Sequence, residues 1–368
     1  MSFRITDADS IFLDNLPADR VYIGNIQVWT PGFTFNTQWK TDNPGVSPSN
    51  SIRLPLEKDG EYAFTVRWGD GTIELVEKAP LREIFTVTDL TQNLSSDNPR
   101  QENVIEHSYD NAGVKNLVIT GKIEGWSFNN EGDRRKLLNV QSWGSFEPGN
   151  NGGYFYGCEN MKIDAPDVIN LENTTYMLNA FRDCSVLSTT NTFPKWDVSG
   201  ITDMRFMFAG ATNFNDDLSE WITGNVETTR FMFYDAKAFN QNIGGWNMIN
   251  NKNMGYMFTG AESFNQNIGG WLTQNVDDID YMFNGASSFN QNIGNWNIEK
   301  VTEIRRIFEN SGLSTQIYSS ILQGWASQTV QPNLFLDAGD IKYFSSASSA
   351  RDTLINVYGW TINDGGQE

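Results

Sequence analysis

The chain has 368 residues and a formal net charge of −19 at pH 7, which argues against a nucleic-acid-binding protein because phosphate binding needs clustered lysines and arginines. Charged residues make up 19% and aromatic residues 13% of the chain, which indicates globular domains rather than disorder. No apolar run reaches the roughly 18 residues of a transmembrane helix, so membrane insertion is not expected.

Residues 1–31 form the first predicted segment. Residues 1–19 mix acidic and apolar side chains and lack the hydrophobic segment of a signal peptide. Residues 20–29 alternate around Gly24-Asn25, which predicts a β-hairpin. This hairpin resembles those that open many tailed-phage virion proteins, which implies attachment to other virion proteins; an ordinary edge hairpin is the alternative. The candidate attachment residues are Arg20, Tyr22, Ile23 and Trp29.

Residues 32–121 are predicted to form a small β-sandwich, because strand patterns alternate with clusters of Pro, Gly, Asn and Asp. The turn Trp68-Gly-Asp-Gly71 and the later His107-Ser-Tyr109 resemble elements of the polycystic-kidney-disease-type (PKD) immunoglobulin-like domain. That resemblance implies a rigid spacer or contact domain and not an enzyme. The strand candidates are residues 33–38, 51–55, 62–68, 72–76, 84–87, 104–109 and 115–120.

Few residues in the chain could carry catalysis or bind a metal. His107 is the only histidine, and within the PKD-like strand we expect it to pack and form hydrogen bonds rather than react. One histidine and two separated cysteines leave no zinc cluster. Cys158 and Cys184 lie about one repeat apart in a column of small residues; buried thiols are expected, with a disulfide as the alternative. We predict no catalytic, cofactor-binding or metal-binding residue.

Residues 122–310 are predicted to form a solenoid. The repeats begin irregularly, and from Trp196 to Phe308 the same residues recur every 25 positions. Such a period indicates stacked units that bury their apolar faces only against neighbours. Equal positions should therefore form internal ladders of Trp, Phe and Met, and each Asn should cap turn amides and bond the Asn one repeat away. An Asn ladder used as a ligand or metal site is the alternative. The columns include Trp196, Trp221, Trp246, Trp271 and Trp296; Phe214, Phe239, Phe264 and Phe289; and Asn215, Asn240, Asn265 and Asn290.

The repeat itself carries a resemblance. Phe239-Asn-Gln-Asn-Ile-Gly-Gly-Trp246 followed by Met254-Gly-Tyr-Met-Phe-Thr-Gly-Ala261 is similar to the repeat of BspA-type leucine-rich-repeat surface proteins, found on bacterial surfaces and in some phages. The resemblance runs from about residue 35 to the end of the chain. It implies a mainly β chain with short helices, a leucine-rich-repeat-like solenoid, and a function in adhesion and host contact.

Residues 311–368 break the period and are predicted to form a C-terminal α/β cap. Apolar spacing predicts helices at residues 316–327 and 348–358, with a strand at residues 333–336 between them. Trp325, Trp360 and Phe344 are expected to cover the last repeat.

Two neighbouring columns of the repeat form a candidate binding strip. If these side chains face outward, they form an aromatic strip flanked by arginines, suited to stacking on sugar rings or to binding a protein. If they face inward, they belong to the core. The residues are Arg205, Phe206, Arg230, Phe231, Tyr256, Tyr281, Arg305 and Arg306.

The sequence therefore predicts a non-enzymatic virion structural or adhesion protein, such as a phage tail fibre, receptor-binding protein or capsid decoration protein, on the virion surface. A bacterial adhesin of the BspA-like type, at the cell surface or secreted, is the alternative. The solenoid would contact a host surface protein or glycan, and a homo-oligomer is left open. A glycan-active enzyme is disfavoured because the adjacent acids Asp216, Asp217 and Glu220 occur in one repeat only.

Overall fold

The structure is a computed structural model that describes residues 34–76, 105–189 and 192–368 with their side chains. The backbone is also described for residues 77–78 and for six short strands outside these ranges. The chain divides into two compact units, Met1–Asn173 (unit 1) and Thr174–Glu368 (unit 2). It is mainly β with few short helices, as the sequence predicts, and its sheets are open; the β-sandwich of residues 32–121 stays a prediction. The division into residues 1–31, 32–121, 122–310 and 311–368 stays a prediction.

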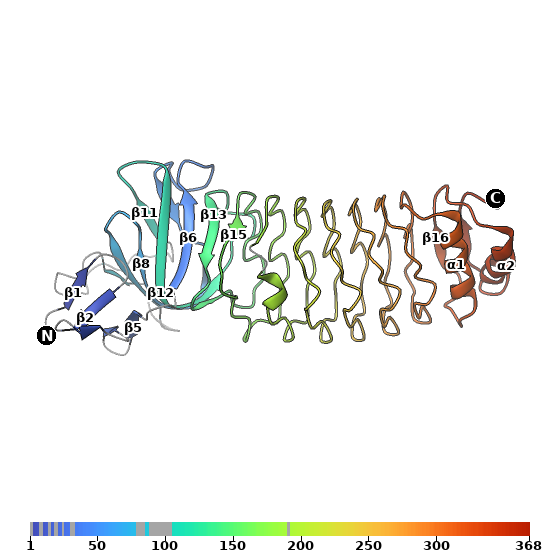
Figure 1. Ribbon diagram of the computed structural model, residues 1–368, viewed down its shortest axis with the longest axis horizontal. Helices are drawn as coiled ribbons and strands as arrows, with labels where there is room; N and C mark the ends of the chain where they lie inside the picture. The colour runs from blue at the N-terminus through green and yellow to red at the C-terminus, as the bar shows by residue number, and fades with distance from the viewer. Residues whose placement is uncertain are drawn as a thin grey trace. The chain divides into compact units, whose positions relative to one another are not determined.

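Unit 1 contains an eight-stranded sheet with the order β10-β9-β8-β12-β6-β13-β15, in which β14 pairs with β12 (Figure 1). A separate two-stranded ribbon pairs β7 with β11. All seven predicted strands of residues 32–121 are present. The strands are β6 (Thr34–Lys40), β7 (Ser51–Arg53), β8 (Leu56–Arg67), β9 (Ile73–Lys78), β10 (Phe85–Val87), β11 (Glu106–Ser108), β12 (Val114–Trp126), β13 (Leu137–Ser142), β14 (Phe146–Glu147) and β15 (Lys162–Ile163).

The sheet of unit 1 continues into the segment where the sequence places the first repeats. Strand β13 pairs antiparallel with β6, and β15 pairs parallel with β13. The alternation of β6 buries Phe35, Thr37 and Trp39 on one face. The ring of Phe35 lies 4.4 Å from that of Phe146 and 5.4 Å, edge to face, from that of Trp126. This aromatic cluster lies in the core of unit 1.

The N-terminal strands are described at the level of the backbone. Strands β1 (Phe3–Thr6), β2 (Ser10–Leu13) and β3 (Leu16–Pro17) form one sheet. Strands β4 (Val21–Ile23) and β5 (Ile26–Trp29) pair antiparallel, which confirms the predicted hairpin strands. The turn Gly24-Asn25, the residue Arg20 and the side chains of Tyr22, Ile23 and Trp29 lie outside what the structure describes.

In unit 2 the chain stacks in parallel turns, one above the next (Figure 1). A single parallel bridge links each turn to its neighbour at the same position of the repeat. The bridge column is Tyr176, Asp203, Thr228, Asn253, Asp278 and Glu303. Backbone hydrogen bonds continue this register; for example, the N–H of Phe233 donates to the carbonyl of Met257 at 2.9 Å.

Equal residues meet as internal ladders, as predicted. The rings of Trp221 and Trp246 are 6.1 Å apart and nearly parallel, and Trp246 and Trp271 follow at 6.5 Å. Each of these indoles is at most 3% exposed. Each also donates to a carbonyl of the preceding turn; the Nε1 of Trp271 bonds the oxygen of Ile243 at 3.0 Å. The only polar atom of each of these side chains, the indole nitrogen, is therefore buried with a hydrogen-bond partner.

The Asn column also behaves as predicted. The Oδ1 of Asn215 accepts the backbone N–H of Asn240 at 2.8 Å, and the Oδ1 of Asn240 accepts that of Asn265 at 2.9 Å. The series ends at the C-terminal cap, where the N–H of Ser314 donates to the Oδ1 of Asn290 at 2.9 Å. These side chains satisfy corner amides that the single bridge leaves open.

The C-terminal cap contains α1 (Thr315–Ala326), with Ser314 as its N-cap, and α2 (Ser348–Asn356), with parallel β16 (Phe335–Asp337) and β17 (Thr361–Asn363). Short 3-10 helices occur at Phe193–Lys195 and Ser345–Ala347. Trp325 stacks on Phe308 at 5.8 Å, so it covers the last turn as expected. Phe344 is 41% exposed, and its role in the cap stays a prediction. Within the described residues, neither helix is long and apolar enough to cross a bilayer.

The Trp ladder should dominate the stability of unit 2. Trp271→Ala removes a ring that is 3% exposed and should lower the free energy of unfolding by about 3–5 kcal/mol. Urea unfolding followed by circular dichroism measures this loss. The matched control is Leu272→Ala, because its neighbouring side chain is 51% exposed and the change should stay within about 0.5 kcal/mol. Equal losses in the two variants would contradict the ladder's role.

Candidate partner-binding site

The candidate strip is neither core nor freely exposed. Phe206, Phe231, Tyr256 and Tyr281 are all half-buried and stack face to face along unit 2. Their ring centroids are separated by 4.4 Å, 4.4 Å and 4.6 Å in turn, with planes within 15° of parallel. The structure therefore brings these four predicted site residues together as one continuous ladder on the outside of the turns.

Every ring of the strip sits on a left-handed backbone position. The φ angles of Phe206, Phe231, Tyr256 and Tyr281 are 55°, 60°, 61° and 56°. A bulky residue in this region is unfavourable by about 1–2 kcal/mol, and glycine or asparagine would adopt it more readily. The same position in the first turn is Asn179, with φ 55°. Ring stacking, worth about 0.5–1.5 kcal/mol per pair, offsets this strain.

Arginines cover the ring faces that the stack leaves open. The guanidinium of Arg182 lies 4.8 Å from the ring centroid of Phe206 at one end. Arg306 lies 5.8 Å from the ring of Tyr281 at the other. Arg230 lies at the side of the stack, 4.9 Å and 5.0 Å from the ring centroids of Phe231 and Tyr256, whose faces are covered by neighbouring rings. The strip therefore presents ring edges and tyrosine hydroxyls, rather than open ring faces, to a partner.

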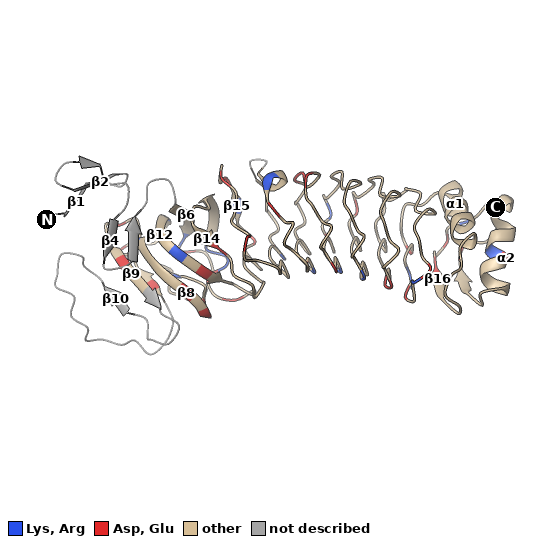
Figure 2. Ribbon diagram, turned by 90° about the horizontal axis from the view of Figure 1, so that it is seen from below, with Lys and Arg blue, Asp and Glu red and all other residues tan. Residues whose placement is uncertain are grey.

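Carboxylates that the sequence reasoning missed balance the strip's arginines. Arg205 pairs with Asp203 at 2.6 Å, and Arg305 pairs with Asp280 at 2.6 Å. Arg230 reaches Asp278, two turns away, in a third ion pair. Two of these three partners, Asp203 and Asp278, lie in the bridge column, at a fixed offset before the strip residues. Both acidic and basic residues occur along the turns (Figure 2).

The electrostatics of the strip are those of satisfied ion pairs. The hydrogen bonds that Arg205 donates to Asp203 raise the pKa of Arg205, and those that Arg305 donates to Asp280 raise the pKa of Arg305. Burial raises the pKa of Asp278, against the opposing effects of the Asp280 backbone N–H and Arg230. Gly255 provides the room that this pair needs, because a Cβ there would lie 2.7 Å from Arg230 Nη1. The strip is charge-balanced and is not built to capture an anion.

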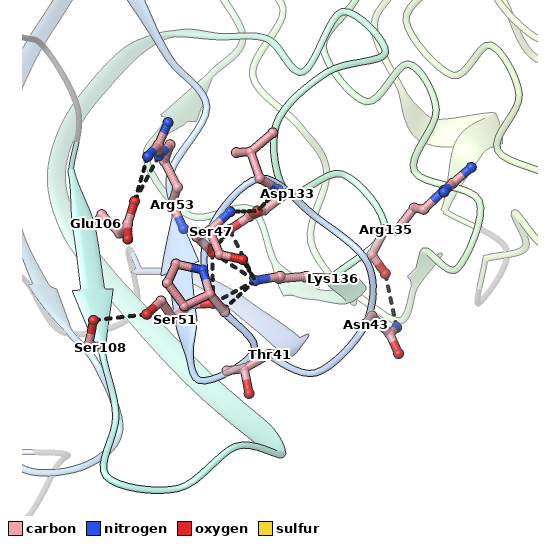
Figure 3. A network of polar contacts seen from close by, with 12 residues as sticks. Thr41, Asn43, Ser47, Ser51, Arg53, Glu106, Ser108, Asp133, Arg135 and Lys136 are labelled. Carbon is pink, nitrogen blue, oxygen red and sulfur yellow. Dashed lines mark hydrogen bonds and ion pairs between the residues drawn. The ribbon is translucent and has the colours of Figure 1, made fainter.

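A second polar cluster lies in unit 1 around a fully buried ion pair, Asp133 and Lys136 (Figure 3). The Nζ of Lys136 donates to Ser47 Oγ at 2.7 Å and to the carbonyls of Ser47, Pro48 and Ser51. Asp133 accepts the backbone N–H of Ser47 at 3.0 Å. Burial lowers the pKa of Lys136, and Asp133 opposes that shift. Every N–H of this ammonium has an acceptor. The cluster therefore holds the loop before β7 in place and does not form an open binding site.

The lone histidine has the structural environment expected of it. The ring of His107 stacks on Trp68 at 4.8 Å and bonds Asp70 at 2.7 Å. Burial opposes ionisation of Asp70, but the hydrogen bonds from His107 and Thr72 outweigh it and lower the pKa of Asp70. Cys158 and Cys184 are buried thiols. Among the described residues, no group of three or more His, Cys, Asp or Glu side chains could hold a metal ion.

The geometry defines a protein built from stacked short repeats with an aromatic strip on its outer side. The sequence profile of one family, described as "Mycoplasma protein of unknown function, DUF285", matches residues 151–271 and 242–338. The matches overlap and together cover just over half of the chain, so the chain belongs to this family. The match supports the resemblance to BspA-type repeat proteins. No curated protein and no solved structure matches the chain.

Replacing two rings of the strip tests whether it is a surface ladder or core. In the double variant Tyr256→Asn, Tyr281→Asn the lost stacking should be offset by relief of left-handed strain, so unfolding free energy should change by less than about 1 kcal/mol. Asn179 shows that Asn fits this position. The control Met257→Ala, in the fully buried neighbour, should lose about 2–5 kcal/mol. A loss of that size in the double variant would place the rings in the core.

The buried ion pair gives a prediction for unit 1. Asp133→Asn leaves the ammonium of Lys136 buried without its counter-charge and should lower the free energy of unfolding by about 3–5 kcal/mol. Guanidinium unfolding measures it. The control is Asp42→Asn, which breaks the exposed Lys40–Asp42 pair at 3.6 Å and should change stability by no more than about 1 kcal/mol. Similar losses of unfolding free energy in the two variants would contradict the stabilising role of the buried pair.

Proposed function

We propose that this protein is a non-enzymatic surface adhesion protein whose repeats form a leucine-rich-repeat-like solenoid of the BspA type. Its strip, from Phe206 to Arg306, contacts a protein partner. The observation that carries the proposal is the outer aromatic ladder, which keeps four large rings at backbone positions where Asn or Gly would be less strained. A purely structural corner would not need them.

The chemistry of the strip fits a protein partner. Tyr, Phe and Arg are enriched in the centres of protein interfaces, where half-buried rings that are already ordered lose little entropy on binding. The ring faces are covered by one another and by Arg182 and Arg306, which favours a protein over stacked sugar rings. Because the arginines have carboxylate partners, affinity would come from packing more than from charge.

A catalytic function has less support. The adjacent acids Asp216, Asp217 and Glu220 occur in one turn only, and Asp217 accepts the N–H of Ser219 in a tight turn at 2.9 Å. Burial raises the pKa of Asp216, yet a paired and repeated arrangement is lacking in the described turns. We therefore assign no reaction to the chain.

Residues 32–121, within unit 1, are proposed as a PKD-type spacer that carries the repeats. The turn at residues 68–71, closed by the Asp70–His107 bond and the stacking of His107 on Trp68, supports this assignment. A rigid domain of this kind would hold the adhesive repeats away from the surface that displays them.

The family match favours display on a bacterial cell surface. The antiparallel pairing of β4 with β5 is the one observation that favours the virion alternative, with residues 1–31 as the attachment segment. Immunogold labelling of intact bacteria and of purified particles separates the two. We expect label on the cell exterior; label confined to particles, and lost when residues 1–31 are deleted, would establish the virion role instead.

Adhesion through the strip is tested with fluorescent full-length chain on cultured host cells. The variant Phe231→Asn, Tyr256→Asn, Tyr281→Asn should bind about tenfold or more weakly, because it removes interface anchors. Protease treatment of the cells should have the same effect on the unmodified chain. Leu272→Asn, at an exposed apolar residue outside the strip, is the control and should bind normally. Undiminished binding by the triple variant would exclude the strip as the contact site.

A further inference from the structure

A second surface of unit 2 lies further along each turn, at the Phe-Asn-Gln-Asn-Ile segment. We call it the amide corner. It consists of two rows of exposed or half-exposed asparagines, one residue of each row on each turn, that follow the stack. The first row is Asn215, Asn240, Asn265 and Asn290, and the second row is Asn242, Asn267 and Asn292.

The carbonyl oxygens of both rows point into the turns. In the first row each Oδ1 accepts a backbone N–H of the next turn, as Asn240 does from Asn265 at 2.9 Å. In the second row each Oδ1 accepts an N–H of its own turn; Asn267 accepts that of Gly269 at 3.1 Å. The Nδ2 groups therefore face outward, and in the part of the chain described here they donate to no protein acceptor. The corner is a double row of neutral donors.

Four glycines lie beside these rows, and the fold requires only two of them. At Gly244 and Gly269, a Cβ would lie 2.5 Å and 2.6 Å from a carbonyl oxygen of the next turn, so close stacking demands glycine there. At Gly245 and Gly270, a Cβ would meet nothing within 4 Å, and neither residue has a positive φ. Glycine is the residue whose ordering costs most entropy, so its use at the second pair needs another reason.

The same column shows that side chains are tolerated. The equivalent residues of the flanking turns are Glu220 and Asn295, both exposed. In the two middle turns the backbone beside the donor rows, at Gly245 and Gly270, is therefore not covered by a side chain. Glycine without a local requirement is typical of places where a ligand approaches the backbone closely.

We propose that the amide corner binds a neutral glycan chain that lies along the stack, over the bare backbone at Gly245 and Gly270. Each turn supplies carboxamide N–H donors to the hydroxyl and ring oxygens of the sugar above it. At this corner successive turns are 5.9–6.1 Å apart, as measured between the stacked phenylalanine rings that precede the first row, a spacing of the order of one sugar unit. Donors repeated at a constant spacing therefore suit a glycan built from identical sugar units.

The composition of the corner selects this partner over others. Residues 240–245, 265–270 and 290–295 contain no lysine or arginine, and the net charge of −19 opposes a polyanion. None of their large apolar side chains is exposed, so the anchors of a protein interface are missing. Neutral hydroxyl groups remain as the matching chemistry. This inference does not depend on the aromatic strip or on the protein partner proposed for it.

The chain itself supplies conservative variants for the test. Asp217 occupies the second row in an earlier turn and makes the same turn bond, with Ser219 at 2.9 Å. The triple variant Asn242→Asp, Asn267→Asp, Asn292→Asp therefore keeps the turn oxygen and removes the outward donors of the second row. Gly245→Asn with Gly270→Asn copies Asn295 and covers the bare backbone without a clash. Both variants should fold, which thermal melting by circular dichroism verifies.

Titration calorimetry of the full chain with cellohexaose, maltohexaose and mannohexaose measures binding. We expect at least one of them to bind, and each variant to weaken it about tenfold or more, as for the loss of several hydrogen bonds. The strip variant Tyr256→Asn, Tyr281→Asn should bind the glycan normally, which separates this site from adhesion through the strip. The proposal is overturned if no neutral hexasaccharide binds, if only a sulfated one does, or if both corner variants bind like the unmodified chain.

Discussion

The single parallel bridge between successive turns is the constraint on which unit 2 depends. Because it joins Asp203 to Thr228 and Thr228 to Asn253 at the same place in each repeat, every other position of the repeat also meets its own copy. Trp then packs on Trp and Phe on Phe, and each indole N–H reaches a carbonyl of the preceding turn. No turn can bury these groups alone, so stability arises only from the stack.

The same constraint creates both candidate surfaces. Closing each turn requires a left-handed residue at one corner and capped backbone amides at another. At the first corner large rings occupy the strained position and stack on each other. At the second corner asparagines satisfy the amides and leave their nitrogens outside. A periodic scaffold therefore repeats any surface chemistry along its axis, which suits extended partners and polymers more than small substrates.

Regular stacking leaves the register between equal turns weakly specified. Residues that depart from the repeat specify that register. Arg230 pairs with Asp278 two turns away, and Gly255 leaves room for it; this contact exists in one register only. Asn251 is fully buried in a column that is otherwise Ile201, Val226, Val276 and Val301, and it bonds Thr229 at 3.3 Å. Such unequal contacts distinguish one turn from the next. In unit 1, the buried Asp133–Lys136 pair fixes a loop in a comparable way.

The sequence by itself determined which residues of successive repeats contact each other. The spacing of Trp, Phe and Asn predicted the ladders, and alternation predicted the seven strands of residues 32–121. Helical spacing placed one helix at residues 316–327, where α1 runs from Thr315 to Ala326. Only the tertiary structure decided that β13 joins the sheet of β6, that Arg182 and Arg306 cover the end faces of the strip, and that position 245 does not require glycine. Periodicity specifies which positions are equivalent, but backbone φ, side-chain direction and pairs such as Arg230–Asp278 depend on how the turns close in space.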